Sequence, residues 1–307
     1  MVKQQKASAL RLNQVSKPAE LVFQLVLGCF SLICIVPFVF VMIISFSSEE
    51  SIRQFGYSFI PKALSLEAYQ VVFELGDQLW RSYFNSFFVT IIGTLTSMAV
   101  CVLYAYPLFR KDYKYRSFFN FMSFFTMIFG GGMIPTYIIC KQLLGLSDNY
   151  AALIVPMLLN PFNIIIMRTF FQTSVPPELI EAATIDGSGE YGTLARIILP
   201  IVKPGLATVA LLTSLSYWNE WFLPLLYITD NKLIPLQYLL MQMQRNSEFL
   251  ARQSSMIGVE GAKIAASLPN QSMKMAIVVF IVIPIACAYP FFQRYVVAGL
   301  TVGSVKG

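Results

Sequence analysis

PPELIEAATIDGSGEYGTLARIILP, residues 176–200, is a polar stretch between apolar runs that are each long enough to cross a bilayer. Its two opening prolines preset the entry to a helix, and the glutamates that follow suit the first turn of that helix. Asp186-Gly187 then marks a break. The stretch is therefore predicted to form two short helices with a bend between them. The second helix is predicted to carry one apolar face, made at helical spacing by Tyr191, Leu194, Ala195 and Ile198.

Periodicity alone fits two interpretations of residues 176–200. In the first, an amphipathic hairpin rests on the membrane surface. In the second, the stretch docks onto another protein, because Ala182 and Ala183 leave the first helix thin enough for a second surface to approach its backbone. The local pattern favours neither.

The composition indicates a membrane protein. The 307-residue chain is 56% hydrophobic and 12% charged, which is too apolar for an ordinary soluble domain and too evenly apolar for a single anchor. Its net charge is +6, and the basic residues gather near the ends of apolar runs. The positive-inside rule explains that placement, so we expect no nucleic-acid partner.

Several kinds of chemistry are excluded by what the sequence lacks. Without histidine there is no Ser/His triad, HExxH metal site or imidazole proton relay. Without a GxxxxGK[ST] loop, any ATP hydrolysis must belong to another polypeptide. Five cysteines lie in or beside apolar runs with no CxxC pair, which predicts small core residues rather than metal ligands or disulfides: Cys29, Cys34, Cys101, Cys140 and Cys287.

Six apolar runs predict six transmembrane helices with both termini in the cytoplasm. The membrane domain would cover residues 21–300, between a cytoplasmic N-terminal segment, 1–20, and a cytoplasmic tail, 301–307. We expect the first run to be a retained span rather than a signal peptide, and a break in the third at Gly130-Gly131-Gly132 and Pro135. The predicted spans are about 21–46, 83–107, 118–140, 150–171, 205–228 and 273–292.

This topology places residues 176–200 in the cytoplasm. The turn after the second span is internal because it carries a compact basic cluster, Arg110, Lys111, Lys114 and Arg116. Alternation then makes the stretch after the fourth span internal as well, although acidic residues outnumber basic ones there. A protein partner for the stretch would explain this exception to the charge rule.

The stretch also resembles a known motif. Its spacing of Glu181-Ala182-Ala183, three residues, Gly187, nine residues and Ile197-x-Leu199-Pro200 is similar to the EAA motif of permease subunits in bacterial ABC importers. The resemblance implies a coupling helix that sits in a cleft of a separate ATPase subunit. The residues to which it assigns this role are Glu181, Ala182, Ala183, Asp186, Gly187, Ile197, Leu199 and Pro200.

Further resemblance extends from about Arg81 onward and narrows the family. GGGMIPTY, NPFN and SYWNEWFLPL are similar to the second permease subunit of carbohydrate ABC importers, of the maltose-importer MalG type. GGGMIPTY and NPFN look closer to the branch for complex or acidic oligosaccharides, including alginate and rhamnogalacturonan fragments. The resemblance implies an all-helical, MetI-like bundle of a type I importer in the bacterial plasma membrane.

The same resemblance implies a set of partners. These are a second, homologous permease subunit, two ATP-binding subunits that hold ATP and Mg²⁺, an extracytoplasmic substrate-binding protein, membrane lipid and the carbohydrate. This chain itself would bind no cofactor or metal. Its long external segment, 229–272, matches no motif, so contact between that segment and the binding protein stays a hypothesis.

Polar and aromatic residues in the fourth and fifth spans are candidates for the substrate pathway. Sugars need amides, carboxylates and hydroxyls together with flat aromatic faces, and an ionisable group within a span is costly. Membrane-interface anchoring, helix capping or helix–helix contact would equally explain such residues, and Arg168 is expected to extend to the inner surface. The candidates are Asn160, Asn163, Tyr217, Trp218, Asn219 and Glu220.

Three other functions are alternatives. An intramembrane enzyme would need a nucleophile and a base at one depth, and Glu220 has no evident partner for that. A receptor or scaffold would not need a complete EAA pattern. A permease for peptides, amino acids or anions is the remaining alternative, against which the run Tyr217 to Trp221 favours sugar.

Overall fold

The computed structural model describes residues 17–74, 76–257 and 270–304, and their regular structure is helical. Their contacts separate two compact units, Met1–Val71 with Pro269–Val279 and Val72–Leu268 with Phe280–Gly307. The all-α fold class predicted from the sequence is confirmed.

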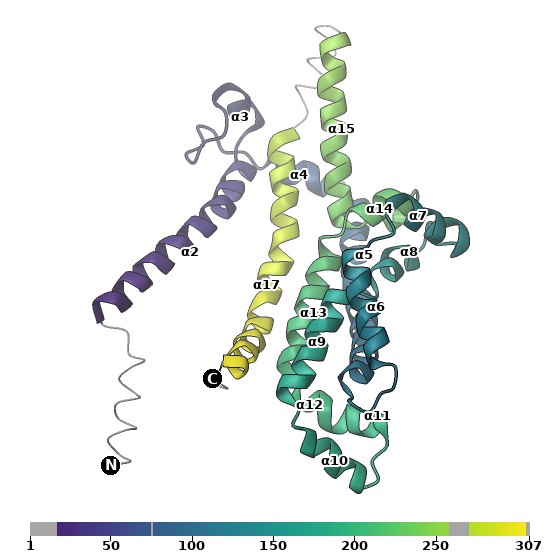
Figure 1. The fold of residues 1–307 in the computed structure, drawn as a ribbon. Helices are drawn as coiled ribbons and strands as arrows, with labels where there is room; N and C mark the ends of the chain where they lie inside the picture. The colour runs from purple at the N-terminus through teal and green to yellow at the C-terminus, as the bar shows by residue number, and fades with distance from the viewer. Residues whose placement is uncertain (1–16, 75, 258–269, 305–307) are drawn as a thin grey trace. The chain divides into compact units, whose positions relative to one another are not determined.

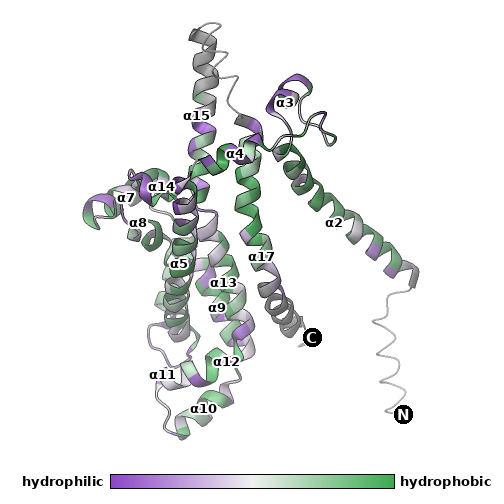
Figure 2. Ribbon diagram, turned by 180° about the vertical axis from the view of Figure 1, so that it is seen from behind, coloured by the Kyte–Doolittle hydropathy of each residue, from purple (hydrophilic) through white to green (hydrophobic). Residues whose placement is uncertain are grey.

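The smaller unit contains α2 (Lys17–Ser45) and α3 (Glu49–Phe55) and the first turns of α17 (Asn270–Ser304). α2 is apolar along most of its length (Figure 2). Glu49 joins the two ends of this unit, because its carboxylate accepts from the backbone N–H groups of Gln271 and Ser272 at the start of α17. A carboxylate at this position satisfies N–H groups that have no partner within the helix.

The larger unit is built around α5 (Asp77–Phe109), which packs against α9 (Pro161–Ser174) and α13 (Lys203–Trp218) (Figure 1). α5 and α13 approach closely at Gly93, where an added Cβ would lie 2.7 Å from the Tyr217 ring. Toward the C-terminal end of α5, its side chains pack with those of the neighbouring helices in a hydrophobic core. The fully buried members of this core include Ala105, Met167, Phe171, Ile198 and Val209.

Breaks interrupt several of the predicted spans. α6 (Arg116–Ile128) is followed after 129–132 by α7 (Met133–Ile138) and the π-helix η1 (Ile139–Leu143), at 111°. This confirms the break expected at the glycine triplet. α8 (Ala151–Ile154) and the 3₁₀ turn η2 (Val155–Met157) meet α9 at 54°. The predicted span 205–228 is not one helix: α13 ends at Trp218 and α14 (Phe222–Tyr227) is separate.

Length and composition allow up to six membrane spans in the described residues. Pro18–Ser45, Asp77–Phe109 and Gln271–Pro290 are each long and apolar enough alone, and three bent helix pairs would each supply one more. This number is compatible with the six predicted. The long segment after the fifth span contains the short η4 (Asn231–Leu233) and then α15 (Leu236–Ile257), which the sequence pattern had not indicated.

Candidate coupling site

Residues 176–200 form short helices at the end of the larger unit opposite α14 and α15 (Figure 1). The first, α10 (Pro177–Ile185), ends at Asp186, and Gly187 follows with φ +75°. Glycine adopts this backbone region without the steric cost that a Cβ brings. The backbone N–H groups of Gly187 and Ser188 return to the carbonyls of Thr184 and Ala183 (3.1 and 2.9 Å). The predicted bend is confirmed, and glycine is required there.

α10 has an outer and an inner face. Glu181 and Ala182 are exposed, and Ile185 keeps 86% of its surface accessible, whereas Ala183 is buried against the unit. The thin helix expected from two adjacent alanines therefore presents one of them outward. The outer face combines a carboxylate, a small residue and an unburied apolar side chain.

The second half of the stretch differs from the predicted regular helix. α11 (Glu190–Gly192) leads into a π-helix, η3 (Thr193–Ile198), and then into α12 (Leu199–Ile201). Leu194 and Ile198 are buried, but Tyr191 is 81% exposed and Ala195 is exposed too. The prediction of one apolar face from these four residues is therefore wrong. In a π-helix the bonds run from i to i+5, so the wider turn shifts side chains away from α-helical spacing.

The last motif residues lie where η3 becomes α12. Ile197 and Leu199 are half-buried, and Leu199 packs against the core, whereas Pro200 is exposed. The backbone N–H of Leu199 bonds to the carbonyl of Leu194, five residues earlier. Pro200 has no N–H to continue the ladder. The motif thus ends at a local departure from α-helical geometry.

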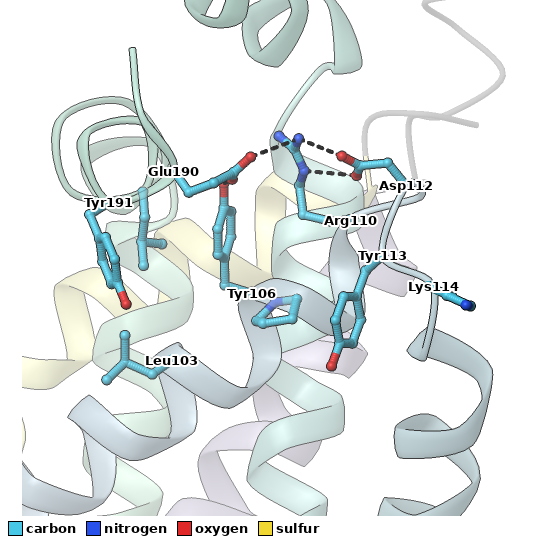
Figure 3. A pocket seen from close by; sticks show the side chains of 10 residues that line it. Leu103, Tyr106, Arg110, Asp112, Tyr113, Lys114, Glu190 and Tyr191 are labelled. Carbon is cyan, nitrogen blue, oxygen red and sulfur yellow. Dashed lines mark hydrogen bonds and ion pairs between the residues drawn. The ribbon is translucent and has the colours of Figure 1, made fainter.

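A polar cluster ties this second half to the end of α5 (Figure 3). The Tyr106 hydroxyl donates to Glu190 Oε2, and Arg110 Nη2 lies 3.1 Å from Glu190 Oε1. Arg110 also binds Asp112 through two parallel hydrogen bonds (3.0 and 2.8 Å), an arrangement stronger than a single neutral hydrogen bond. We call Tyr106, Arg110, Asp112 and Glu190 the α5–α11 latch.

Hydrogen bonding stabilises the charged forms of two latch groups, Arg110 and Asp112. The hydrogen bonds from Arg110 lower the pKa of the Asp112 carboxyl, and those bonds are also the largest cause that raises the pKa of Arg110. One guanidinium thus holds two carboxylates, one from its own turn and one from residues 176–200. A cavity of about 660 Å³ opens beside it, lined by Leu103, Tyr113 and Tyr191 among others.

The motif residue Glu181 faces a second cavity. This cavity, about 710 Å³, lies between α10 and the turn that joins α5 to α6, and its lining includes Arg110, Lys111 and Arg116. Residues 176–200 and the basic turn, predicted separately to be cytoplasmic, therefore lie side by side. Glu181 is therefore exposed to solvent and also lines the cavity that contains these basic residues.

Three of the six substrate-pathway candidates share a cavity. Asn160, Asn163 and Tyr217 line a space of about 380 Å³ together with Thr213 and Ser216. Asn160 also caps α9 by accepting from the N–H groups of Phe162 and Asn163. The buried Asn163 amide donates to Thr213 Oγ1 (3.1 Å) and so links α9 to α13.

The other three candidates lie outside that cavity lining. Trp218 is buried, packs edge-on against Phe87, and its indole N–H has no hydrogen-bond partner among the described residues. Asn219 donates to the carbonyl of Leu215. Glu220 Oε1 accepts from two backbone N–H groups at the start of α14 (2.7 and 2.9 Å). The carboxylate therefore stabilises the break after α13.

Comparison with known proteins gives the family. The permease protein YtcP of the polygalacturonan/rhamnogalacturonan transport system of Bacillus subtilis is 40% identical over 278 residues, which cover 91% of this chain and 94% of YtcP. Protein LplC of Bacillus subtilis is 41% identical over 283 residues, covering 92% and 93%. The chain is a carbohydrate ABC importer permease.

A solved structure supports the same family. In the crystal structure of a bacterial ABC transporter involved in the import of the acidic polysaccharide alginate, one chain matches with a TM-score of 0.76 and 31% identity, over 92% of this permease and 99% of that chain. No family model matches the sequence. The predicted membership and the predicted role in carbohydrate import are confirmed, and the permease is a multi-pass protein of the inner membrane.

The sequence pattern did not predict two polar junctions at the other end of the larger unit. Buried Asn85 on α5 donates to the carbonyls of Lys232 and Ile234 and accepts from the Tyr150 hydroxyl (2.8, 3.2 and 2.7 Å). The Asp148 carboxylate accepts hydrogen bonds from the backbone N–H of Thr229, from the backbone N–H of Asp230 and from the Thr229 hydroxyl. A signal for the first was available, since an asparagine within an apolar span rarely lacks a partner.

Proposed function

We propose that residues 176–200 receive mechanical work from an ATPase subunit and pass it to α5. The observation that carries this proposal is the α5–α11 latch, which links the EAA-like stretch to the longest helix of the larger unit. The exposed outer face of α10 leaves Glu181, Ala182 and Ile185 available to a partner. A displaced α10 would therefore move α5 rather than only the loop itself.

The proposed complex contains this permease, a second permease, two ATP-binding subunits and an extracytoplasmic binding protein. ATP and Mg²⁺ bind in the ATP-binding subunits. Both termini of the permease, and the basic turn, face the cytoplasm, which agrees with the positive-inside rule. ATP binding closes the ATPase cleft and shifts the spans from an inward-facing to an outward-facing packing, and hydrolysis resets them.

The proposed substrate is an oligosaccharide that carries carboxylates. Two similar proteins support this, because one is named for polygalacturonan and rhamnogalacturonan transport and the other imports alginate, and these polymers are acidic. The amide and hydroxyl groups of Asn160, Asn163 and Ser216 that line the 380 Å³ cavity are suited to sugar hydroxyls. We assign Asn160 and Asn163 a pathway role alongside their structural hydrogen bonds.

Coupling is tested in the reconstituted importer with Glu181→Lys and Gly187→Leu. We expect both variants to insert and to assemble poorly coupled complexes, in which ATP hydrolysis no longer responds to substrate and transport is lost. Glu178→Lys is the matched control, since Glu178 is exposed on the same helix but lies outside the motif. Normal substrate-stimulated ATPase activity in the Glu181 and Gly187 variants would refute the coupling role.

The substrate is tested separately, with a panel of neutral and acidic oligosaccharides offered to the same importer together with its binding protein. We expect uptake of uronate-containing oligosaccharides to exceed uptake of neutral ones of equal length. Equal uptake of both, or uptake of neutral sugars alone, would reject the acidic substrate and leave carbohydrate import unaffected.

A further inference from the structure

Two arginines from different helices converge on one neutral side chain at the inner end of the permease. Arg116 is the first residue of α6, and Arg168 lies on α9. With the Gln172 amide oxygen turned toward them, it accepts from Arg116 Nη2 (3.1 Å) and Arg168 Nη2 (3.2 Å). Both guanidiniums therefore approach the same atom, although their charges repel each other.

This pair is not neutralised within the described part of the chain. None of the ion pairs there includes either guanidinium, whereas neighbouring Arg110 has both Asp112 and Glu190. Arg116 Nε is fixed by the carbonyl of Leu108 (2.9 Å), which holds the guanidinium in place. Two positioned arginines without a carboxylate are the arrangement that proteins use to bind planar or tetrahedral oxyanions.

A second feature points to the same ligand chemistry. α6 is 13 residues long and no side chain caps its N-terminus, although the N–H of Arg116 itself bonds to the carbonyl of Tyr113 (3.1 Å). Free N–H groups at a helix start attract phosphate groups. Arg116 and Gln172 also border the 710 Å³ cavity, in which Lys111 adds a further cation and the carboxylates of Asp112 and Glu181 lie in the same lining.

The rest of α6 indicates that the oxyanion belongs to a lipid. Beyond Arg116 this helix exposes a series of large apolar side chains, Phe118, Phe121, Phe124 and Phe125. A soluble anion would gain nothing from them, whereas acyl chains would pack along them while the headgroup stays at the helix start. We propose that Arg116, Arg168 and Gln172 bind the phosphate of an anionic phospholipid.

The bound lipid would bridge α6 and α9 close to the entry of the coupling stretch. Gln172 lies in the last turn of α9, shortly before Pro177 begins α10. Relief of the repulsion between the arginines would hold the two helix ends together and fix the base from which α10 projects. Anionic lipid thereby stabilises the permease, independently of which sugar it carries.

The test is lipid titration of the purified importer complex in a zwitterionic detergent, followed by native mass spectrometry and thermal unfolding. Phosphatidylglycerol, phosphatidylcholine and inorganic phosphate are the three additions. We expect phosphatidylglycerol to bind and to raise the unfolding temperature, and the Arg116→Gln/Arg168→Gln variant to bind it at least about tenfold more weakly. Lys114→Gln/Lys203→Gln, which removes two exposed cations, is the matched control and should bind normally.

Four results would overturn the proposal. Equal loss of binding in the lysine control would indicate unspecific surface charge, and an equal effect of inorganic phosphate would indicate a free-anion site. If the arginine variant still binds the lipid but loses the ATPase subunits, Arg116 and Arg168 bind a protein partner instead. If the double variant does not fold, Gln172→Leu is used, and undiminished phosphatidylglycerol binding by it would reject the assigned geometry.

Discussion

The Tyr217 hydroxyl donates a hydrogen bond of 3.0 Å to the carbonyl oxygen of Ile154, where α8 gives way to the 3₁₀ turn η2. In that turn the N–H of Leu158 bonds to Val155 instead, so the regular α-helical bond to Ile154 is not made. The Ser97 hydroxyl, 2.9 Å from the Tyr217 hydroxyl, then acts as its donor. A tyrosine from α13 thus completes the backbone bonding of a bent span, as irregular backbone in a membrane requires.

Tyr217→Phe should therefore destabilise the permease by about 1–3 kcal/mol, because a buried carbonyl and the Ser97 hydroxyl both lose a partner. The thermal unfolding of the detergent-solubilised complex measures this, with Tyr115→Phe at an exposed side chain as control. The KM for sugar transport should not change. A raised KM with unaltered stability would instead assign the hydroxyl to substrate.

Glu190→Gln should weaken coupling more than it weakens the fold. The Glu190 side chain is 59% exposed, so solvent screening limits the loss of stability to less than about 1 kcal/mol. The variant should transport less sugar per ATP hydrolysed, because α11 no longer holds Arg110 and Tyr106 firmly. The ratio of transport to hydrolysis in proteoliposomes checks this.

A double-mutant cycle tests whether the α5–α11 latch accounts for the loss of coupling. Tyr106→Phe removes the hydrogen bond to Glu190, and Glu190→Gln removes the negative charge that strengthens it, so their effects on the transport ratio should be less than additive. Tyr106→Phe with Glu178→Gln, which lies away from the latch, should be additive. Full additivity within the first pair would show that the two residues act separately.

Helix breaks that depend on local residue types could be predicted from the sequence. Contacts between distant segments could not. Gly187 and the glycine triplet after α6 end helices through their own backbone freedom, so both breaks were predicted. The π-helix η3 was not predicted, and Tyr191, in the turn before it, is exposed against its periodicity. The bond between Glu190 and Arg110 joins segments 80 residues apart, which no helical spacing encodes.

Candidate residues show the same division. The cost of a carboxylate in an apolar run singled out Glu220, but only the structure shows that the run is broken there and that Glu220 caps the next helix. Asn85 carried a similar signal, and its three partners come from segments that the sequence treated as loops or as the start of another span.

Asn85→Ala should loosen the segment between α14 and α15. It removes the only side chain that the described structure shows bonded to both Lys232 and Ile234 carbonyls, and it leaves the Tyr150 hydroxyl without that acceptor. We expect a destabilisation of roughly 2–3 kcal/mol and faster proteolysis at Lys232. Gln78→Ala, which removes one bond to the carbonyl of Asn231, is the control and should have a smaller effect. Equal cleavage rates would contradict the role of Asn85.

Asp148 should keep the loop at Thr229 and Asp230 ordered even at low pH. The Thr229 hydroxyl, followed by the N–H groups of Asp230 and Thr229, lowers the pKa of the Asp148 carboxyl below its ordinary value of 3.8. Because the folded pKa is the lower one, the stabilisation is fully present above pH 3.8 and is lost as the pH falls through the folded pKa. Hydrogen-exchange protection of the Thr229 and Asp230 amides, corrected for intrinsic rates, should stay constant from about pH 7 to 5 and fall only in stronger acid. Asp148→Asn should lower that protection at every pH, whereas Asp77→Asn, at an exposed carboxylate, should not. A decline already between pH 7 and 5 in the unmodified permease would mean that another group controls the loop.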